Sequence, residues 1–233
     1  MHDTRPTSKN HILNSFSDET MSRLSHDFEH VDMPSGRILY ASYEEITHIY
    51  FPENSMASIV ANTSAGQSTE IGVVGREGAV GLEALMGVAT TPHESMIQIP
   101  NGGWRIRVAP LATEFNDNAA VRATLLLFQY KFTAQVSQTA LCNRVHAVEH
   151  RLTRWLLLCH DRVDGDNLRL TQEFLAVMLG VTRVSVTLAA QILQDQGLIR
   201  YARGSITIVD RASLEAASCD CYGIVKREYD RTS

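Results

Sequence analysis

The sequence lacks long apolar runs and has few cysteines, which argues against a membrane-spanning chain and a disulfide-rich secreted domain. Its longest apolar stretches are short, such as residues 155–159, whereas a helix needs roughly 20 apolar residues to span a bilayer. Residues 1–16 also lack the apolar core of a signal peptide. Without an export signal, the four cysteines are better explained as free thiols than as disulfides. We therefore expect a soluble, cytoplasmic protein.

The sequence also lacks an excess of positive charge, since its formal net charge is -5. Such a balance argues at first against a nucleic-acid partner. The charge is unevenly distributed, however, because residues 1–143 sum to -6 and residues 144–233 to +1. The basic residues of the second part are almost all arginines. Because only a small surface of a protein meets DNA, the net charge of the whole chain does not exclude DNA binding.

Short segments rich in β-branched and aromatic residues fill the first half of the chain. They alternate with turns that contain proline, glycine or asparagine, and short strands at such regular spacing are typical of a β-sandwich or barrel. The expected strands are 37–40, 46–51, 58–60, 70–74 and 96–99, and the expected turns are 34–36, 52–54, 64–66 and 101–103.

A long helix is predicted to follow Pro110, over about residues 118–142. Its apolar residues recur at spacings of three and four, which places them on one face of a helix. This stripe has two interpretations: it packs only on the β-rich domain of its own chain, or it also pairs with a second copy in a dimer. The residues of the stripe, which form the candidate dimer interface, are Val121, Leu125, Phe128, Phe132 and Val136.

The most informative pattern lies in residues 170–195, after a further predicted helix at about 147–160 and a turn at 164–167. Thr171 is expected to cap a helix that ends at Gly180, where the backbone requires a positive φ. Thr182 is expected to cap a second helix. Two such helices joined by a short glycine turn are the helix-turn-helix pattern. The expected buried face of the second helix consists of Val186, Ala189, Ala190 and Leu193.

The second helix of this pair is the candidate recognition helix. Residues at the N-terminal end of a recognition helix reach base edges, and Arg183 can bind O6 and N7 of guanine. Val184 or Leu188 can contact a thymine methyl group, whereas Ser185 and Thr187 can bind phosphates. The candidate DNA-binding residues are Thr171, Gln172, Thr182, Arg183, Val184, Ser185, Thr187, Leu188, Gln191 and Arg203.

Two short β-runs within residues 198–209 flank the turn Arg203-Gly204, and this pattern predicts a hairpin, or wing. At the turn, Arg203 can neutralise a phosphate and position the recognition helix without reading sequence. A helix pair alone would also fit an ordinary α-helical domain. The capped second helix, the glycine turn and the wing together favour a DNA-binding domain.

The motif TQEFLAVMLGVTRVSVTLAAQILQDQGLIR, residues 171–200, resembles the Crp/Fnr family of transcription regulators. Together with the β-rich first half and the central helix, the resemblance extends over nearly the whole chain. It implies an α+β fold with a β-roll sensor-like domain over residues 1–117, a central dimerisation helix over 118–142 and a winged helix-turn-helix domain over 143–233. The β-roll would be of the cyclic-nucleotide-binding type, a double-stranded β-helix.

The resemblance also implies partners and residue roles. The family forms homodimers along the central helix and binds palindromic DNA with one recognition helix per half-site, and RNA polymerase is a further candidate partner. Arg183 falls where the family places a base-reading arginine. Val184 and Leu188 stand where a glutamate and another arginine are common, so the operator should differ from that of the catabolite activator.

The β-rich half departs from the family at the residues that would bind an effector. Members that bind cyclic nucleotides use a glutamate for the ribose and an arginine for the phosphate. Here Leu82 stands where the glutamate is expected, and the region of His93 and Glu94 lacks the arginine. Arg76 and Glu83 are conceivable substitutes, but a solvated turn is the simpler interpretation. Because an anionic phosphate buried without a cation is costly, we do not expect cyclic nucleotide binding.

The cysteines and histidines suggest no cofactor. Oxygen-sensing members of the family hold an iron–sulfur cluster on N-terminal cysteines, and no cysteine here precedes Cys142. Cys219 and Cys221 could bind zinc or respond to oxidation near a histidine or another cysteine. Two ligands do not complete a tetrahedral site, so thiols that pack against the domain are the favoured interpretation. The histidines around one helix, His146, His150 and His160, are more often surface or helix-end residues.

We therefore expect no metal, no cofactor and, in the absence of a nucleophile elbow or P-loop, no enzymatic activity. Two classes of function stay open. The favoured one is a DNA-binding regulator, and the alternative is a small-molecule or redox sensor module whose helix-turn-helix mediates protein contacts. Sequence-specific, salt-dependent DNA binding distinguishes the two.

Overall fold

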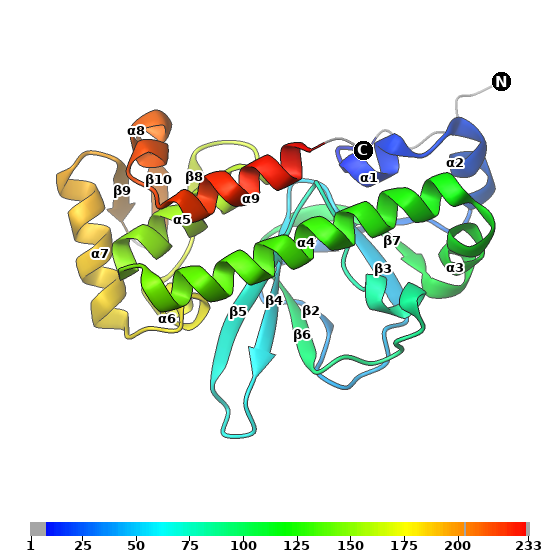
Figure 1. The fold of residues 1–233 in the computed structure, drawn as a ribbon, viewed down its shortest axis with the longest axis horizontal. Helices are drawn as coiled ribbons and strands as arrows, with labels where there is room; N and C mark the ends of the chain where they lie inside the picture. Colours follow the sequence, from blue (N-terminus) through cyan, green and yellow to red (C-terminus); the bar gives the residue numbers. More distant parts are fainter. Residues whose placement is uncertain (1–7, 203, 232–233) are drawn as a thin grey trace. The chain divides into compact units, whose positions relative to one another are not determined.

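The computed structural model of the chain describes residues 8–202 and 204–231, and its helices and strands are labelled in Figure 1. The chain divides into two compact units, Met1–Ile59 with Val74–Phe132 and Val60–Val73 with Thr133–Ser233. Strand β4 (Met56–Asn62) and helix α4 (Ala119–Val145) contribute residues to both units. The mixed α+β class that the sequence predicts is confirmed.

The first unit contains a β-roll and short helices. Strand β7 lies between β1 and β3 in one antiparallel sheet, and β2, β6 and β4 follow one another in a second sheet. The five strands expected from the sequence are present, while β1, β7, α1, α2 and α3 were not anticipated. The elements are α1 (His11–Ser15), α2 (Asp18–Leu24), β1 (Glu29–Met33), β2 (Ile38–Tyr40), β3 (His48–Pro52), η1 (Leu82–Met86), β6 (His93–Ile99), β7 (Asn101–Arg107) and α3 (Val108–Asp117).

Strand β7 replaces the turn that was expected at residues 101–103, and its glycines explain why the prediction was wrong. A Cβ atom on Gly103 would lie 2.5 Å from the carbonyl oxygen of Phe51 and 2.8 Å from Cε of Met33. Phe51 belongs to β3 and Met33 to β1, the two strands that pair with β7. Glycine inside a strand often marks such a close approach, which a single sequence does not distinguish from a turn.

Helix α4 covers the expected central helix and extends it by three residues at its C-terminal end. Val121, Leu125 and Phe128 of the expected dimer stripe are buried within the chain, while Phe132 and Val136 are partly buried. The ring of Phe128 occupies the space that a side chain at Gly78 would need. These contacts favour the first interpretation of the stripe, in which it packs on its own domain. Pairing with a second copy stays a prediction.

The second unit is built around α5 (Val148–His160), the helix expected at 147–160. Its predicted apolar face, Leu152, Trp155, Leu156 and Cys159, is buried, and Nε1 of Trp155 donates a hydrogen bond of 2.7 Å to the buried carboxylate of Glu70. The other elements of the unit are β5 (Ser68–Val74), β8 (Asn167–Arg169), α6 (Gln172–Leu179), α7 (Arg183–Asp195), β9 (Ile199–Ala202), β10 (Ser205–Ile208), α8 (Arg211–Ala216) and α9 (Asp220–Asp230).

Two expectations drawn from composition can be compared with the structure. All four cysteines are free, as expected, and all four are buried. Among the described residues, no single helix has the length and apolarity to cross a membrane, and only the bent pair α6 and α7 meets these criteria together, on length and composition alone.

Candidate nucleic-acid interface

Helices α6 and α7 form the helix-turn-helix that the sequence predicts. Oγ1 of Thr171 accepts a hydrogen bond from the backbone N–H of Phe174 and caps α6. Gly180 ends this helix with φ 60° and ψ 42°, in the left-handed region. Oγ1 of Thr182 then accepts from the N–H of Ser185 and caps α7. The two helices bend by 104° relative to each other, an angle typical of this motif.

The residues of α7 that are buried and those that are exposed agree with the prediction from the sequence. The predicted inner residues Val186, Ala189, Ala190 and Leu193 are all buried. On the outer face, the side chains of Val184 and Leu188 are 67% and 62% exposed. The two side chains are four residues apart, so they lie on one face of the helix and offer apolar contact area to a partner. The candidates Arg183, Thr187 and Gln191 are also exposed, while Ser185 is partly buried.

Arg183 lies at the first position of α7 and is held by the first turn of α6. Its Nη1 lies 2.7 Å from Oε1 of Glu173, and its Nε donates to Oε1 of Gln172 at 3.2 Å. A hollow of about 430 Å³ lies between these side chains and the wing. The guanidinium is therefore oriented at the edge of a concave surface, where a base or phosphate would compete with Glu173 for its five N–H donors.

The hydroxyl and amide candidates on α7 are engaged within the helix. The hydroxyl of Thr187 donates to the carbonyl oxygen of Arg183 at 3.0 Å, and the hydroxyls of Thr182 and Ser185 lie 2.9 Å apart. Nε2 of Gln191 donates to Oδ1 of Asp195 at 2.7 Å. The hydroxyl proton of Thr187 is thus engaged, whereas Gln191 has a second N–H and one hydroxyl of the Thr182–Ser185 pair can still donate to a phosphate or a base.

The predicted wing is present as the antiparallel pair β9 and β10, with Gly204 at φ 74°. Arg203 lies outside the described residues. Strand β8 adds to the free edge of β10, which sequence reasoning missed because residues 164–167 read as a turn. Arg169 and Arg200, which were not candidates, are exposed on β8 and β9. The sequence signal that could have identified these two candidates is an arginine in a short strand next to the helix-turn-helix.

Tyr201 fixes the wing to the start of α6. Its hydroxyl donates to the carbonyl oxygen of Leu170 at 3.2 Å, and its backbone N–H donates to Oε1 of Gln194 in α7 at 2.7 Å. Partial burial raises the pKa of the Tyr201 phenol, and the carboxylate of Glu173 acts in the same direction. The phenol therefore stays protonated and keeps its role as a donor at neutral pH.

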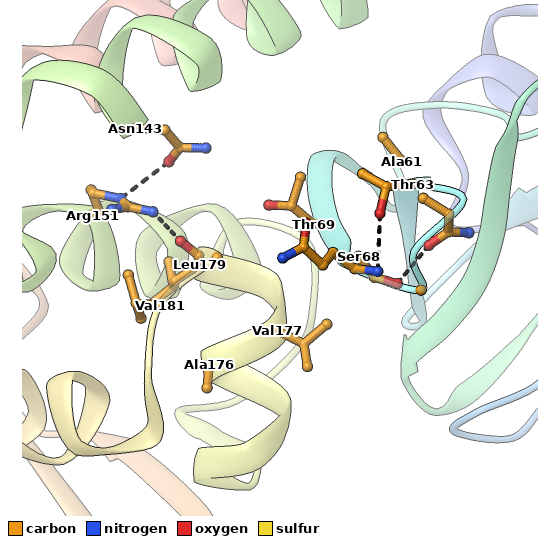
Figure 2. Close-up of a pocket in the computed structure, with 14 residues that line it drawn as sticks. Ala61, Thr63, Ser68, Thr69, Asn143, Arg151, Ala176, Val177, Leu179 and Val181 are labelled. Carbon is orange, nitrogen blue, oxygen red and sulfur yellow. Dashed lines mark hydrogen bonds between the residues drawn. The ribbon is translucent and has the colours of Figure 1, made fainter.

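Arg151 supports the turn of the motif from behind, at the edge of a pocket in the second unit (Figure 2). Its Nε donates to Oδ1 of Asn143 in α4 at 3.1 Å, and its Nη2 donates to the carbonyl oxygen of Leu179, the last residue of α6. The last carbonyls of a helix have no partner within it. Arg151, which sequence reasoning did not select, therefore connects α4, α5 and α6 immediately before Gly180.

The β-roll of the first unit holds one small cavity lined by described residues. A cavity of about 10 Å³ is lined by residues that include Tyr40, Val74, Leu82 and Phe128. That is about the space of one water molecule, whereas small-molecule pockets typically measure roughly 300–1,000 Å³. Arg76, a conceivable phosphate ligand, donates from Nη2 to Oδ1 of Asn54 at 3.0 Å.

Known proteins support this description at two levels. Residues 150–217 match the family model of the Crp-like helix-turn-helix domain, and no curated protein matches the chain. A putative transcriptional regulator of the Crp/Fnr family from Eubacterium rectale has a TM-score of 0.68 and 17% identity, with coverage of 88% of this chain and 96% of its own.

Two further solved structures share the fold. FixK2 from Bradyrhizobium japonicum has a TM-score of 0.70 and 16% identity, with coverage of 82% of this chain and 98% of its own. The c-di-GMP-responsive global regulator CLP from Xanthomonas campestris has a TM-score of 0.64 and 17% identity, with coverage of 83% and 100%. The chain thus has the fold of the Crp/Fnr regulators, and its residues 150–217 form a Crp-like helix-turn-helix domain.

Proposed function

We propose that this chain is a sequence-specific DNA-binding transcription regulator of the Crp/Fnr type, which binds a palindromic operator as a homodimer. The observation that carries the proposal is the outer face of α7, where Arg183, Val184 and Leu188 are exposed on a capped helix beside a wing. A rigid helix with an arginine at its N-terminal end suits the major groove. The exposed arginines of β8 and β9 suit the phosphates on either side.

The proposal assigns different tasks to the charged and apolar side chains. Arg183 reads guanine through its two parallel N–H donors, and Val184 and Leu188 contact thymine methyl groups. Arg203, Arg169 and Arg200 neutralise phosphates and set the register without reading sequence. The remaining candidates, Thr171, Gln172, Thr182, Ser185, Thr187 and Gln191, contribute polar contacts at the edges of the interface.

The homodimer would form along the exposed side of α4. Val121, Leu125 and Phe128 are occupied within the chain, whereas Leu126, Tyr130, Leu141 and Val145 are each about half exposed. Leu126 and Tyr130, like Leu141 and Val145, are one helical turn apart, so each pair lies on one face of the helix. Pairing of these faces would bury apolar surface and place two recognition helices about a two-fold axis.

We propose further that the effector is not a cyclic nucleotide. The small cavity of the β-roll and the buried Leu82 support this statement, because a nucleotide needs both space and a cation for its phosphate. Calorimetric titration of the full chain with cyclic AMP, cyclic GMP and cyclic di-GMP should show no specific heat of binding. Micromolar affinity for any of the three would contradict the proposal.

The DNA-binding proposal is tested by selecting a binding site from random double-stranded DNA with the full chain. Chromatin immunoprecipitation with sequencing in the native host would then show whether the same motif is occupied in cells. We expect a two-fold symmetric motif and an affinity that falls steeply with salt. Enrichment of no motif, with weak binding to all DNA, would favour the alternative of a helix-turn-helix that contacts protein. A contact with RNA polymerase stays a prediction.

A further inference from the structure

Three cysteines and one histidine from distant parts of the sequence meet in the second unit. The ligand atoms of Cys142, His146, Cys219 and Cys221 all lie within 4.8 Å of one another. The three cysteines are buried and the histidine is partly buried. We propose that this cluster binds one zinc ion and that the ion fastens helix α9 to the C-terminal end of α4.

The distances within the cluster fit a tetrahedral zinc site. With Zn–S bonds of about 2.3 Å and a Zn–N bond of about 2.0 Å, tetrahedral angles place two sulfurs about 3.8 Å apart and a sulfur and a nitrogen about 3.5 Å apart. Sγ of Cys142 lies 3.7 Å from Sγ of Cys219, and Sγ of Cys221 lies 3.4 Å from Nδ1 of His146. A disulfide would require about 2.05 Å between the sulfurs.

The local structure explains how four ligands converge. Cys142 lies in the last turn of α4 and His146 follows four residues later, so both project from the same side. Cys219 is the N-cap residue of α9 and makes no capping hydrogen bond, and Cys221 lies in the first turn of this helix. The backbone N–H groups at a helix N-terminus favour the negative charge of bound thiolates.

Neighbouring polar and charged side chains act on the four ligand residues, as outer-shell groups do in known metal sites. Nδ1 of His146 faces Sγ of Cys221 at 3.4 Å, while its Nε2 lies 3.8 Å from Oδ1 of Asp220, too far for a hydrogen bond. Nε2 of Gln138 donates to Sγ of Cys221 at 3.1 Å. The guanidinium of Arg154, which is 3% exposed, acts electrostatically on Cys142. Three thiolates and a Zn²⁺ ion carry a net charge of -1, and Arg154 offsets it.

Zinc binding at this cluster would involve no change of oxidation state. One Zn²⁺ ion displaces three thiol protons, which pass to solvent, and four coordinate bonds form to three sulfurs and one nitrogen. Helix α9 already contacts α4 through the hydrogen bond of 2.7 Å from Nε2 of Gln135 to the hydroxyl of Tyr229. The ion would therefore link the N-terminal end of α9 to the C-terminal end of α4.

The proposal is tested on the untagged full-length chain, purified with a phosphine reductant and without chelator. Metal analysis by mass spectrometry should give about one zinc per chain, and X-ray absorption should show three sulfur ligands and one nitrogen ligand. His146→Gln and Cys221→Ser should lose the zinc. His150→Gln and Cys159→Ala, which change the same residue types outside the cluster, should retain it.

A second measurement avoids dependence on variants that fail to fold. Removal of zinc from the wild-type chain with a chelator should increase the rate of tryptic cleavage at Lys226 and Arg227 in α9 at least tenfold, and added Zn²⁺ should restore protection. No bound zinc after reconstitution of the reduced chain, another metal in its place, or a Cys142–Cys219 disulfide in chain purified without reductant would overturn the proposal. Retention of zinc by His146→Gln would overturn the ligand set.

Discussion

Arg183, the first residue of the candidate recognition helix α7, forms an ion pair of 2.7 Å with Glu173 in the first turn of α6. The two side chains are 65% and 62% exposed, so the pair contributes at most about 1 kcal/mol to stability. Its importance lies in binding, because the contact to Glu173 competes with guanine for the N–H donors of Arg183. The carboxylate would also face the DNA phosphates.

Removal of the Glu173 charge should therefore strengthen DNA binding. We expect Glu173→Gln to lower the dissociation constant up to about fivefold, the equivalent of about 1 kcal/mol. Fluorescence anisotropy with a labelled operator measures this change. Glu215→Gln in α8 makes the same change of charge away from α7 and is the matched control. Equal gains in the two variants would mean that only net charge matters.

Arg203, which the sequence pattern assigns to the turn of the wing, tests the distinction between positioning and reading. Arg203→Ala should weaken binding to operator and scrambled DNA about equally, because a phosphate contact carries no sequence information. It should also make the slope of log affinity against log salt shallower by about one unit per site. Titrations at four salt concentrations give both quantities. A loss confined to the operator would assign Arg203 to a base.

The two sides of α4 should respond differently to substitution. Leu126→Glu with Tyr130→Glu places charges on the exposed side, so the chain should stay folded and sediment as a monomer in analytical ultracentrifugation. Phe128→Ala on the buried side should instead destabilise the fold by about 3–5 kcal/mol, measured by urea denaturation. A folded double variant that remains dimeric would exclude this side of α4 as the interface.

Local signals made the helix-turn-helix predictable from sequence. Thr171, Gly180 and Thr182 act through hydrogen bonds and backbone angles within a few residues, and the structure confirms all three. The short strands of the β-roll were also predictable, because β-branched residues and turns mark them locally. Strand β8 was not, because its three residues gain their structure by pairing with β10 some forty residues later.

Features that depend on tertiary contacts could not be predicted from the sequence. The apolar stripe of α4 has the same spacing whether it packs on its own domain or on a partner, and only the burial of Val121, Leu125 and Phe128 favours the first. The proposed metal cluster shows the same limit. Cys219 and Cys221 offered two ligands, and the other two lie more than 70 residues earlier in the chain. The expectation of no metal site rested on that incomplete count.

The central claim is that Arg183 reads a base in each half-site of a palindromic operator. Arg183→Ala should cost about 1–3 kcal/mol on the operator and relax base preference at one position per half-site. Its affinity for scrambled DNA should change far less. The deciding measurement is anisotropy titration of the wild type and Arg183→Ala against the operator, its single-base variants and scrambled DNA at one salt concentration. An equal loss of affinity on the operator and on scrambled DNA would contradict the claim and make Arg183 a phosphate contact.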